Sequence, residues 1–69
     1  IRDSSYIIEL KYAARTATDA ELAMQADEGH RQLLQYSEDK VARQLASRTT
    51  FHRLLIQFRG WDMVRCEEV

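Results

Sequence analysis

Hydrophobic and polar residues alternate over the first stretch of the chain. Residues 6–12 are rich in β-branched and aromatic side chains and follow the turn-forming residues 3–5, which predicts a β-strand. Because successive side chains of a strand point to opposite faces, Ile7, Glu9 and Lys11 share one face. The other face is apolar throughout and is expected to be the ordinary core face: Tyr6, Ile8, Leu10 and Tyr12.

A long helix is predicted next. Thr18 and Glu21 have the spacing of a capping box, in which each side chain satisfies a backbone amide of the other. Beyond them, apolar or small residues recur at helical spacing and define one buried stripe: Leu22, Ala26, Gly29 and Leu33. A glycine inside a helix costs about 1 kcal/mol relative to alanine, so Gly29 indicates a helix that lies close against a sheet. The helix is expected to end near Tyr36.

A second, shorter helix is expected after a break at residues 37–40, where polar and acidic side chains can cap a new helix. It would run from Glu38 to about Ser47. Val41 and Leu45 lie one turn apart on the same side of it, and both are expected to be buried.

Two strands complete the pattern. Residues 50–58 predict a strand whose one face carries three apolar side chains: Leu54, Ile56 and Phe58. Arg59 and Gly60 predict a tight turn, and residues 61–68 alternate as a last strand in a hairpin with the preceding one. The order strand, helix, helix, strand, strand predicts a two-layer α/β fold with a mixed sheet and a right-handed crossover. One sheet face and at least one edge would be unprotected.

Composition narrows the class of protein. The 69 residues carry 10 basic and 11 acidic side chains, a formal net charge of −1, and are 45% hydrophobic and 30% charged. This balance is typical of a single folded domain, and it gives no global argument for attraction to nucleic acid or to a membrane. The single cysteine excludes an internal disulfide and a cysteine-based zinc site. No apolar run approaches the roughly 20 residues of a membrane span, and residues 1–5 show no signal-peptide pattern. We therefore expect a cytoplasmic protein.

The first candidate for chemistry is the pair Glu9 and Lys11 on one strand face. A carboxylate is a hard oxygen ligand for Mg²⁺, and a lysine beside it can orient an attacking water or stabilise charge that develops on a phosphoryl group. The plain alternative is a cross-face ion pair, which is common on strands. The apolar neighbours favour a used or paired site, because isolated charges among them cost stability.

The second candidate is Gln32 with Tyr36, one helical turn apart and beside the apolar stripe. On a helix packed over the Glu9 and Lys11 face, an amide and a hydroxyl can position the carboxylate, the lysine or a phosphate. The alternative is an ordinary glutamine at the helix edge and a half-buried tyrosine whose hydroxyl is in water.

Taken together, these motifs resemble the PD-(D/E)XK phosphodiesterase superfamily. More narrowly, the chain is similar to the nuclease-like domain at the C-terminal end of bacterial proteins with an AAA-ATPase-like domain. The stretches that carry the resemblance occur in the family's order and span nearly the whole chain: Tyr6-Ile7-Ile8-Glu9-Leu10-Lys11-Tyr12, Ala20-Glu21-Leu22, Gln32-Leu33-Leu34-Gln35-Tyr36 and Phe58-Arg59-Gly60-Trp61.

The resemblance implies a partial restriction-endonuclease-like core and a hydrolase that cleaves nucleic acid with Mg²⁺ or Mn²⁺. It implies that Glu9 is a metal ligand and that Leu10 offers its carbonyl to the same ion. Lys11 would be the catalytic lysine that assists the nucleophilic water. Gln32 and Tyr36 would be the helical supports of the RecB-like branch of the family.

The chain departs from the family pattern before the first strand. The family's metal-binding Asp lies on the strand that precedes the Glu-x-Lys strand, and Asp3 is too close to Glu9 to be that residue. We therefore expect residues 1–69 to be the C-terminal half of such a domain, a piece of a longer protein, and inactive as a nuclease by themselves. The alternative function is a non-catalytic interaction or dimerisation module that regulates an attached ATPase. We also expect a homo-oligomer, paired through the exposed sheet edge of residues 6–12.

The remaining polar residues have ordinary interpretations. His30 and His52 lie in different elements. His30 is expected to face solvent, His52 to face solvent or a neighbouring subunit, and Cys66 to be half-buried. Trp61 is interpreted as an anchoring aromatic residue. Three arginines could form a basic face near phosphates, but nearby acids favour a solvated surface: Arg53, Arg59 and Arg65.

Overall fold

The computed structural model describes residues 3–69 and has the predicted order of elements. The five elements are β1 (Ser4–Ala13), α1 (Asp19–Ser37), α2 (Lys40–Arg48), β2 (Thr50–Arg59) and β3 (Asp62–Glu68). The strands form one mixed sheet in the order β1-β2-β3, in which β1 and β2 are parallel and β2 and β3 antiparallel. The predicted α/β fold is confirmed, including the parallel crossover and the final hairpin.

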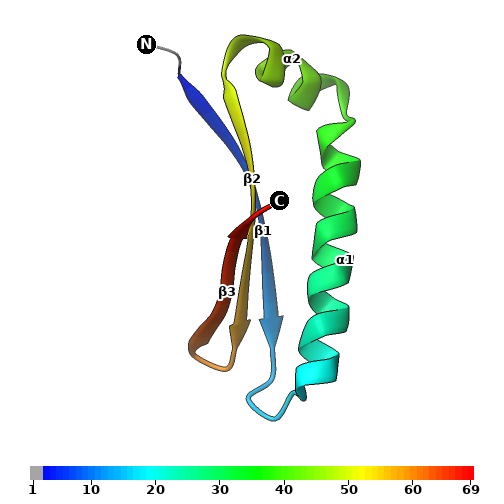
Figure 1. The fold of residues 1–69 in the computed structure, drawn as a ribbon, viewed down its shortest axis with the longest axis vertical. Helices are drawn as coiled ribbons and strands as arrows, with labels where there is room; N and C mark the ends of the chain where they lie inside the picture. Colours follow the sequence, from blue (N-terminus) through cyan, green and yellow to red (C-terminus); the bar gives the residue numbers. More distant parts are fainter. Residues whose placement is uncertain (1–2) are drawn as a thin grey trace.

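Helix α1 runs along one face of the sheet and supplies most of the core (Figure 1). Thr18 caps its start, and the capping box with Glu21 is present in both directions. The predicted stripe is the buried side of the helix: Leu22, Ala26, Gly29 and Leu33. Leu33 and Ala26 pack with Leu55 of β2, and this cluster is the centre of the small core.

The close approach at Gly29 is confirmed. A Cβ atom added there would lie 2.6 Å from Cδ1 of Leu55 and 3.6 Å from Cε of Lys11. Carbon atoms in good contact are about 3.5–4.0 Å apart. Gly29 therefore gives α1 the space to lie directly over β1 and β2, and the helix rests on the face that carries Glu9 and Lys11.

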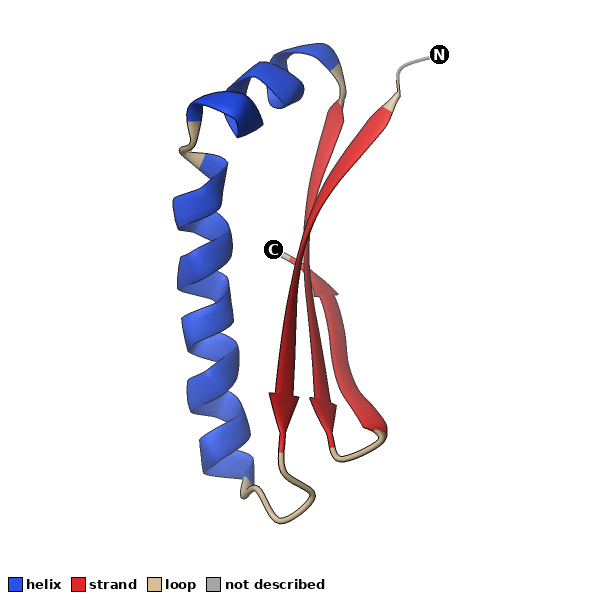
Figure 2. Ribbon diagram, turned by 180° about the vertical axis from the view of Figure 1, so that it is seen from behind, coloured by secondary structure: helices blue, strands red, loops and turns tan. Residues whose placement is uncertain are grey.

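The expectation that Tyr6, Ile8, Leu10 and Tyr12 form the core face of β1 is wrong. Its four large side chains are 57%, 50%, 48% and 66% exposed, in the order Tyr6, Ile8, Leu10 and Tyr12. Alternation placed them together correctly, but α1 covers the opposite face, and Figure 2 shows both helices on one side of the strands. The physical reason is the narrow stripe of α1, whose small residues Ala26 and Gly29 fit over Ile7 and Lys11. We call the uncovered side the open face.

Helix α2 also differs from expectation. It begins at Lys40, capped by the side chain of Asp39, rather than at Glu38. Val41 is 63% exposed and Leu45 is 42% exposed, whereas Ala42 is buried. The expected burial of Val41 and Leu45 is therefore wrong. The helix is short, and the small side chain of Ala42 allows its backbone to lie near its neighbours, which turns Val41 outward.

Each end of a strand lies within two residues of its predicted position, and β1 is three residues longer than predicted. β3 begins at Asp62 because Gly60, with φ of 58°, and Trp61 form the turn. The β1–β2 ladder runs from the pair Ser4 and Thr50 to the pair Ala13 and Arg59. On its other side β1 has no neighbouring strand among residues 3–69, so it is an edge of the sheet.

Candidate active site of a nuclease-like fold

Glu9 and Lys11 form an ion pair beneath α1. The Lys11 Nζ atom is 3.5 Å from Glu9 Oε1, and the two side chains are only 15% and 18% exposed. Strand alternation puts both on the covered face, and α1 adds a second carboxylate, Glu28, 3.9 Å from the same amine. The structure thus brings together the two residues that the sequence predicts to carry chemistry, in a partly desolvated setting where charges interact more strongly than in water.

Gln32 lies on α1 between the levels of Lys11 and Ile7. Gly29 sits beside Lys11, Tyr36 shares a pocket with Ile7, and Gln32 falls between them along the helix. Its Oε1 atom is buried and has no hydrogen-bond partner in the described part of the chain. Buried acceptors of this kind are rare and require an explanation.

Tyr36 occupies a different environment from Glu9 and Lys11. It is 47% exposed and lines an apolar pocket of about 310 Å³ between α2 and β1. The other residues around this pocket are Ile7, Asp39, Val41, Ala42 and Leu45. Along α1, Tyr36 is therefore one turn farther from Lys11 than Gln32 is.

Two oxygen atoms of the kind that bind divalent metals belong to neighbouring residues of β1, the Glu9 carboxylate and the Leu10 carbonyl. Backbone bonds from Thr50 to the Asp3 carbonyl and from Gly60 to the Ala13 carbonyl show that odd-numbered carbonyls of β1 face β2. In a parallel ladder the alternate carbonyls face the other way, so Leu10 directs its oxygen to the free edge, next to Glu9. Both oxygens suit Mg²⁺. However, no cluster of three metal-ligating side chains occurs within residues 3–69, and these residues do not make a complete metal site.

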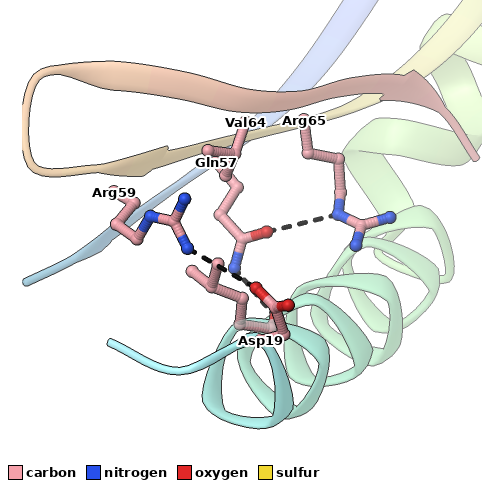
Figure 3. Close-up of a pocket in the computed structure, with 6 residues that line it drawn as sticks. Asp19, Gln57, Arg59, Val64 and Arg65 are labelled. Atoms are coloured by element: carbon pink, nitrogen blue, oxygen red, sulfur yellow. Dashed lines mark hydrogen bonds and ion pairs between the residues drawn. The ribbon is translucent and has the colours of Figure 1, made fainter. Parts of the chain in front are cut away.

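A buried glutamine that the sequence reading did not single out links the helix to the sheet. Gln57 is 0% exposed, and its Nε2 donates to the Leu22 carbonyl at 2.9 Å and to Gln25 Oε1 at 2.8 Å. Its Oε1 accepts from Nε of Arg65 at 3.2 Å, as Figure 3 shows. The available signal was a polar residue between the apolar residues of β2, on the face opposite to Ile56.

This polar network continues to His30. Arg65 pairs with Glu67 at 3.3 Å, and His30 Nε2 lies 2.6 Å from Glu67 Oε1. The hydrogen bond to His30, followed by the positive charge of Arg65, lowers the pKa of the Glu67 carboxyl, although partial burial opposes the shift. The expectation that His30 is a solvated helix residue is therefore wrong, because it ties α1 to β3.

The structure also corrects the expected surroundings of His52, Cys66 and Trp61. His52 is half-buried, stacks on Tyr6 with ring centroids 4.9 Å apart and hydrogen-bonds Glu68. Cys66 is exposed rather than half-buried. Trp61 is 90% exposed in the turn, so it does not anchor the described fold.

The arginine surface is balanced by acids. A pocket of about 280 Å³ lies beside the start of α1 and is lined by Arg59 and Arg65 with Asp19, Leu22, Gln57 and Val64 (Figure 3). Arg59 lies 3.5 Å from Asp19, and Arg65 pairs with Glu67. Each positive charge therefore already has a carboxylate beside it, as expected of a solvated, mixed surface.

Comparison with models of protein families identifies the family of this chain. A family model of the PD-(D/E)XK nuclease superfamily matches residues 1–68, which is nearly the whole chain. The chain belongs to the PD-(D/E)XK nuclease superfamily. Curated proteins and solved structures gave no significant match. No helix among residues 3–69 is long and apolar enough to cross a membrane.

Proposed function

We propose that this PD-(D/E)XK domain contributes to divalent-metal-dependent hydrolysis of nucleic-acid phosphodiesters. The observation that supports the proposal is the partly buried pair of Glu9 and Lys11, 3.5 Å apart on one strand face, in a chain of this superfamily. Structural ion pairs also occur on strands, but this pair lies beneath α1, where a third charged group, Glu28, also approaches the Lys11 amine.

Each residue has a defined part in this proposal. Glu9 and the Leu10 carbonyl would hold Mg²⁺ or Mn²⁺, which supplies Lewis-acid polarisation of a phosphate when bound. Lys11 places a positive charge where negative charge develops during hydrolysis, and Glu28 and Glu9 hold its amine in that position. Gln32 orients the neighbouring groups, and Tyr36 supports the helix from the α2 side.

No cluster of three metal-ligating side chains occurs among residues 3–69, so Glu9 and the Leu10 carbonyl would supply only part of a metal site. Mg²⁺ in proteins is usually bound through one or two carboxylates together with substrate phosphates and water. We therefore expect residues 1–69 alone to show no cleavage.

The test is a DNA and RNA cleavage assay with Mg²⁺ or Mn²⁺. It uses the chain expressed with whatever sequence its gene places before residue 1. We expect Glu9→Gln and Lys11→Met each to lower the rate about 100-fold or more. The matched controls Glu38→Gln and Lys40→Met change the same residue types at exposed positions and should leave the rate unchanged. Cleavage that survives both strand substitutions would overturn the assigned roles, and absence of cleavage in every longer form would remove the enzymatic proposal.

A second candidate function is a non-catalytic interaction module in the cytoplasm, attached to an ATPase. The apolar open face supports it, because exposed apolar patches mark interaction surfaces. In this alternative the domain forms an oligomer and binds no nucleic acid.

A further inference from the structure

The turn between β2 and β3 holds the single tryptophan of the chain in solvent. Trp61 is 90% exposed, more than any other large hydrophobic side chain among residues 3–69. Gly60, with φ of 58°, makes the tight turn without strain, and its N–H donates to the Ala13 carbonyl at 2.9 Å. The turn is thereby tied to the end of β1. Because tryptophan is enriched where proteins bind partners, an indole that an ordered turn keeps outside the core indicates a contact surface.

A guanidinium group lies against the same turn. A Cβ atom added to Gly60 would be 3.3 Å from Cβ and 3.4 Å from Nε of Arg15, in the loop between β1 and α1. None of the ion pairs among residues 3–69 involves Arg15. Figure 1 shows this loop and the β2–β3 turn at the same end of the sheet. We call Arg15, Gly60 and Trp61 the tip, which offers an aromatic ring and an unpaired positive charge within one turn.

The tip stands at the end of the sheet toward which Lys11 lies. Lys11 is level with Gln57 in the parallel ladder, and the turn starts after Arg59, two residues farther along β2. With about 3.3 Å per residue, the tip begins about 7 Å beyond Lys11 along the strands. A chain-like ligand that contacts the Lys11 amine can therefore also reach the tip.

The charges at this end of the molecule do not favour a duplex. Arg59 lies 3.5 Å from Asp19, and the other charged side chains near the tip are one arginine and two acids: Arg15, Glu21 and Asp62. There is no excess of positive charge to hold a duplex through its phosphates, the contact that dominates duplex binding. Stacking on an aromatic ring, by contrast, requires unpaired bases and tolerates any sequence. An exposed indole with one arginine beside its turn thus favours a single strand.

We propose that Trp61 stacks on an unpaired base of single-stranded nucleic acid while Arg15 contacts a neighbouring phosphate. The inference rests on the proposed nucleic-acid function and makes it more specific, since the substrate is then a single strand or a single-stranded end. Every base has an aromatic face, so the contact is common to DNA and RNA. Neither residue belongs to the candidate metal site, and binding at the tip therefore needs no metal.

Binding of oligonucleotides without divalent metal tests the proposal separately from cleavage. The full chain is titrated in EDTA against short labelled oligothymidine and oligouridine, and fluorescence anisotropy gives the Kd. Trp61→Ala should weaken binding about tenfold or more, and Trp61→Phe should largely retain it. Met24→Ala removes another highly exposed apolar side chain, on α1, and should leave binding unchanged. Because Trp61 is the single tryptophan, quenching of the intrinsic indole fluorescence should accompany binding.

The salt dependence tests the part assigned to Arg15. Arg15→Gln should weaken binding and reduce the slope of log K against log salt by about 0.7, the value for one phosphate contact on a single strand. Arg43→Gln, at an exposed position of α2, is the matched control and should leave the slope unchanged. A blunt duplex of the same length should bind at least about tenfold more weakly than the single strand, because its bases are not available for stacking.

Several results would overturn the proposal: no binding of either oligonucleotide, binding that Trp61→Ala does not weaken, a preference for the duplex, or indole fluorescence that changes with protein concentration alone, which would assign Trp61 to a contact between copies. Cleavage is scored separately. A longer form that binds single strands through Trp61 but never cleaves would retain the tip and remove only the hydrolytic proposal. Cleavage that is equal on single and double strands and insensitive to Trp61→Ala would remove only the tip.

Discussion

The close packing of α1 on the sheet at Gly29 predicts that alanine at this position destabilises the fold. In an exposed helix position, glycine to alanine stabilises a protein by about 1 kcal/mol. At Gly29 the new Cβ would lie 2.6 Å from Cδ1 of Leu55, about 1 Å closer than good contact allows. Leu55 is 0% exposed and cannot swing into solvent. Overpacking of this kind costs typically 1–3 kcal/mol, so Gly29→Ala should destabilise the chain by about 1 kcal/mol net.

When the clashing atoms of Leu55 are removed, Gly29→Ala should stabilise the fold instead of destabilising it. Leu55→Val deletes both Cδ atoms while it keeps a strand-favouring side chain, at a cost of about 1 kcal/mol for the lost burial. In that background, Gly29→Ala meets no Cδ1 and should recover its ordinary helix gain of about 1 kcal/mol. The two substitutions should therefore be coupled by about 2 kcal/mol, well above the additivity expected for independent sites.

The assay is urea unfolding followed by far-UV circular dichroism, at one protein concentration for all variants. Asp27, which is exposed on the same helix, supplies the control. The difference between Asp27→Gly and Asp27→Ala calibrates the helix-propensity term without a packing term. If Gly29→Ala stabilises the wild type as much as alanine does at position 27, the close-packing explanation of Gly29 is refuted.

Two further predictions concern the polar network between α1 and β3. The pKa of Glu67 is lowered in the folded state, first by its hydrogen bond to His30, so its contribution to stability is present above the ordinary carboxyl range and is lost as the pH falls through the lowered pKa. Urea unfolding between about pH 6 and pH 3 should accordingly show a shallower acid loss of stability in Glu67→Gln than in wild type, and equal slopes would contradict this. Gln57→Leu should lower the free energy of unfolding by about 1–3 kcal/mol, because it leaves the Leu22 carbonyl and a donor of Arg65 unsatisfied. The exposed control Gln44→Leu should leave the free energy of unfolding unchanged. Equal effects of the two substitutions would show that the network is not stabilising.

The sequence carried enough information for the elements and their order, and the reason is local. The capping box at Thr18 and the glycine turn at Gly60 are chemical features of a few adjacent residues, and both appear where expected. Alternation in β1 correctly grouped Ile7, Glu9 and Lys11. Such signals need no knowledge of what packs against them.

Which side of the sheet the helix covers is not a local property. Both faces of β1 contain apolar residues, and the more apolar one, with Leu10 at its centre, is the open face. The deciding feature is the narrow stripe of Ala26 and Gly29 on α1, which fits over Leu55 and Lys11. The same limit applies to the polar network: nothing near Gln57 in the sequence identifies its partners, which lie on α1 and β3.

Exchanging Glu9 and Lys11 separates a hydrolytic site from a structural ion pair. A hydrolytic site depends on which residue carries the carboxylate and which the amine, because the ligand oxygen and the positive charge act at different points. A structural ion pair depends only on opposite charges lying side by side. The variant Glu9→Lys with Lys11→Glu, in the longer chain that shows cleavage, should therefore retain the fold and lose cleavage. Loss of the fold would indicate that the exchange perturbs the packing beneath α1, where the two side chains are 18% and 15% exposed, and circular dichroism of the same sample would identify that outcome.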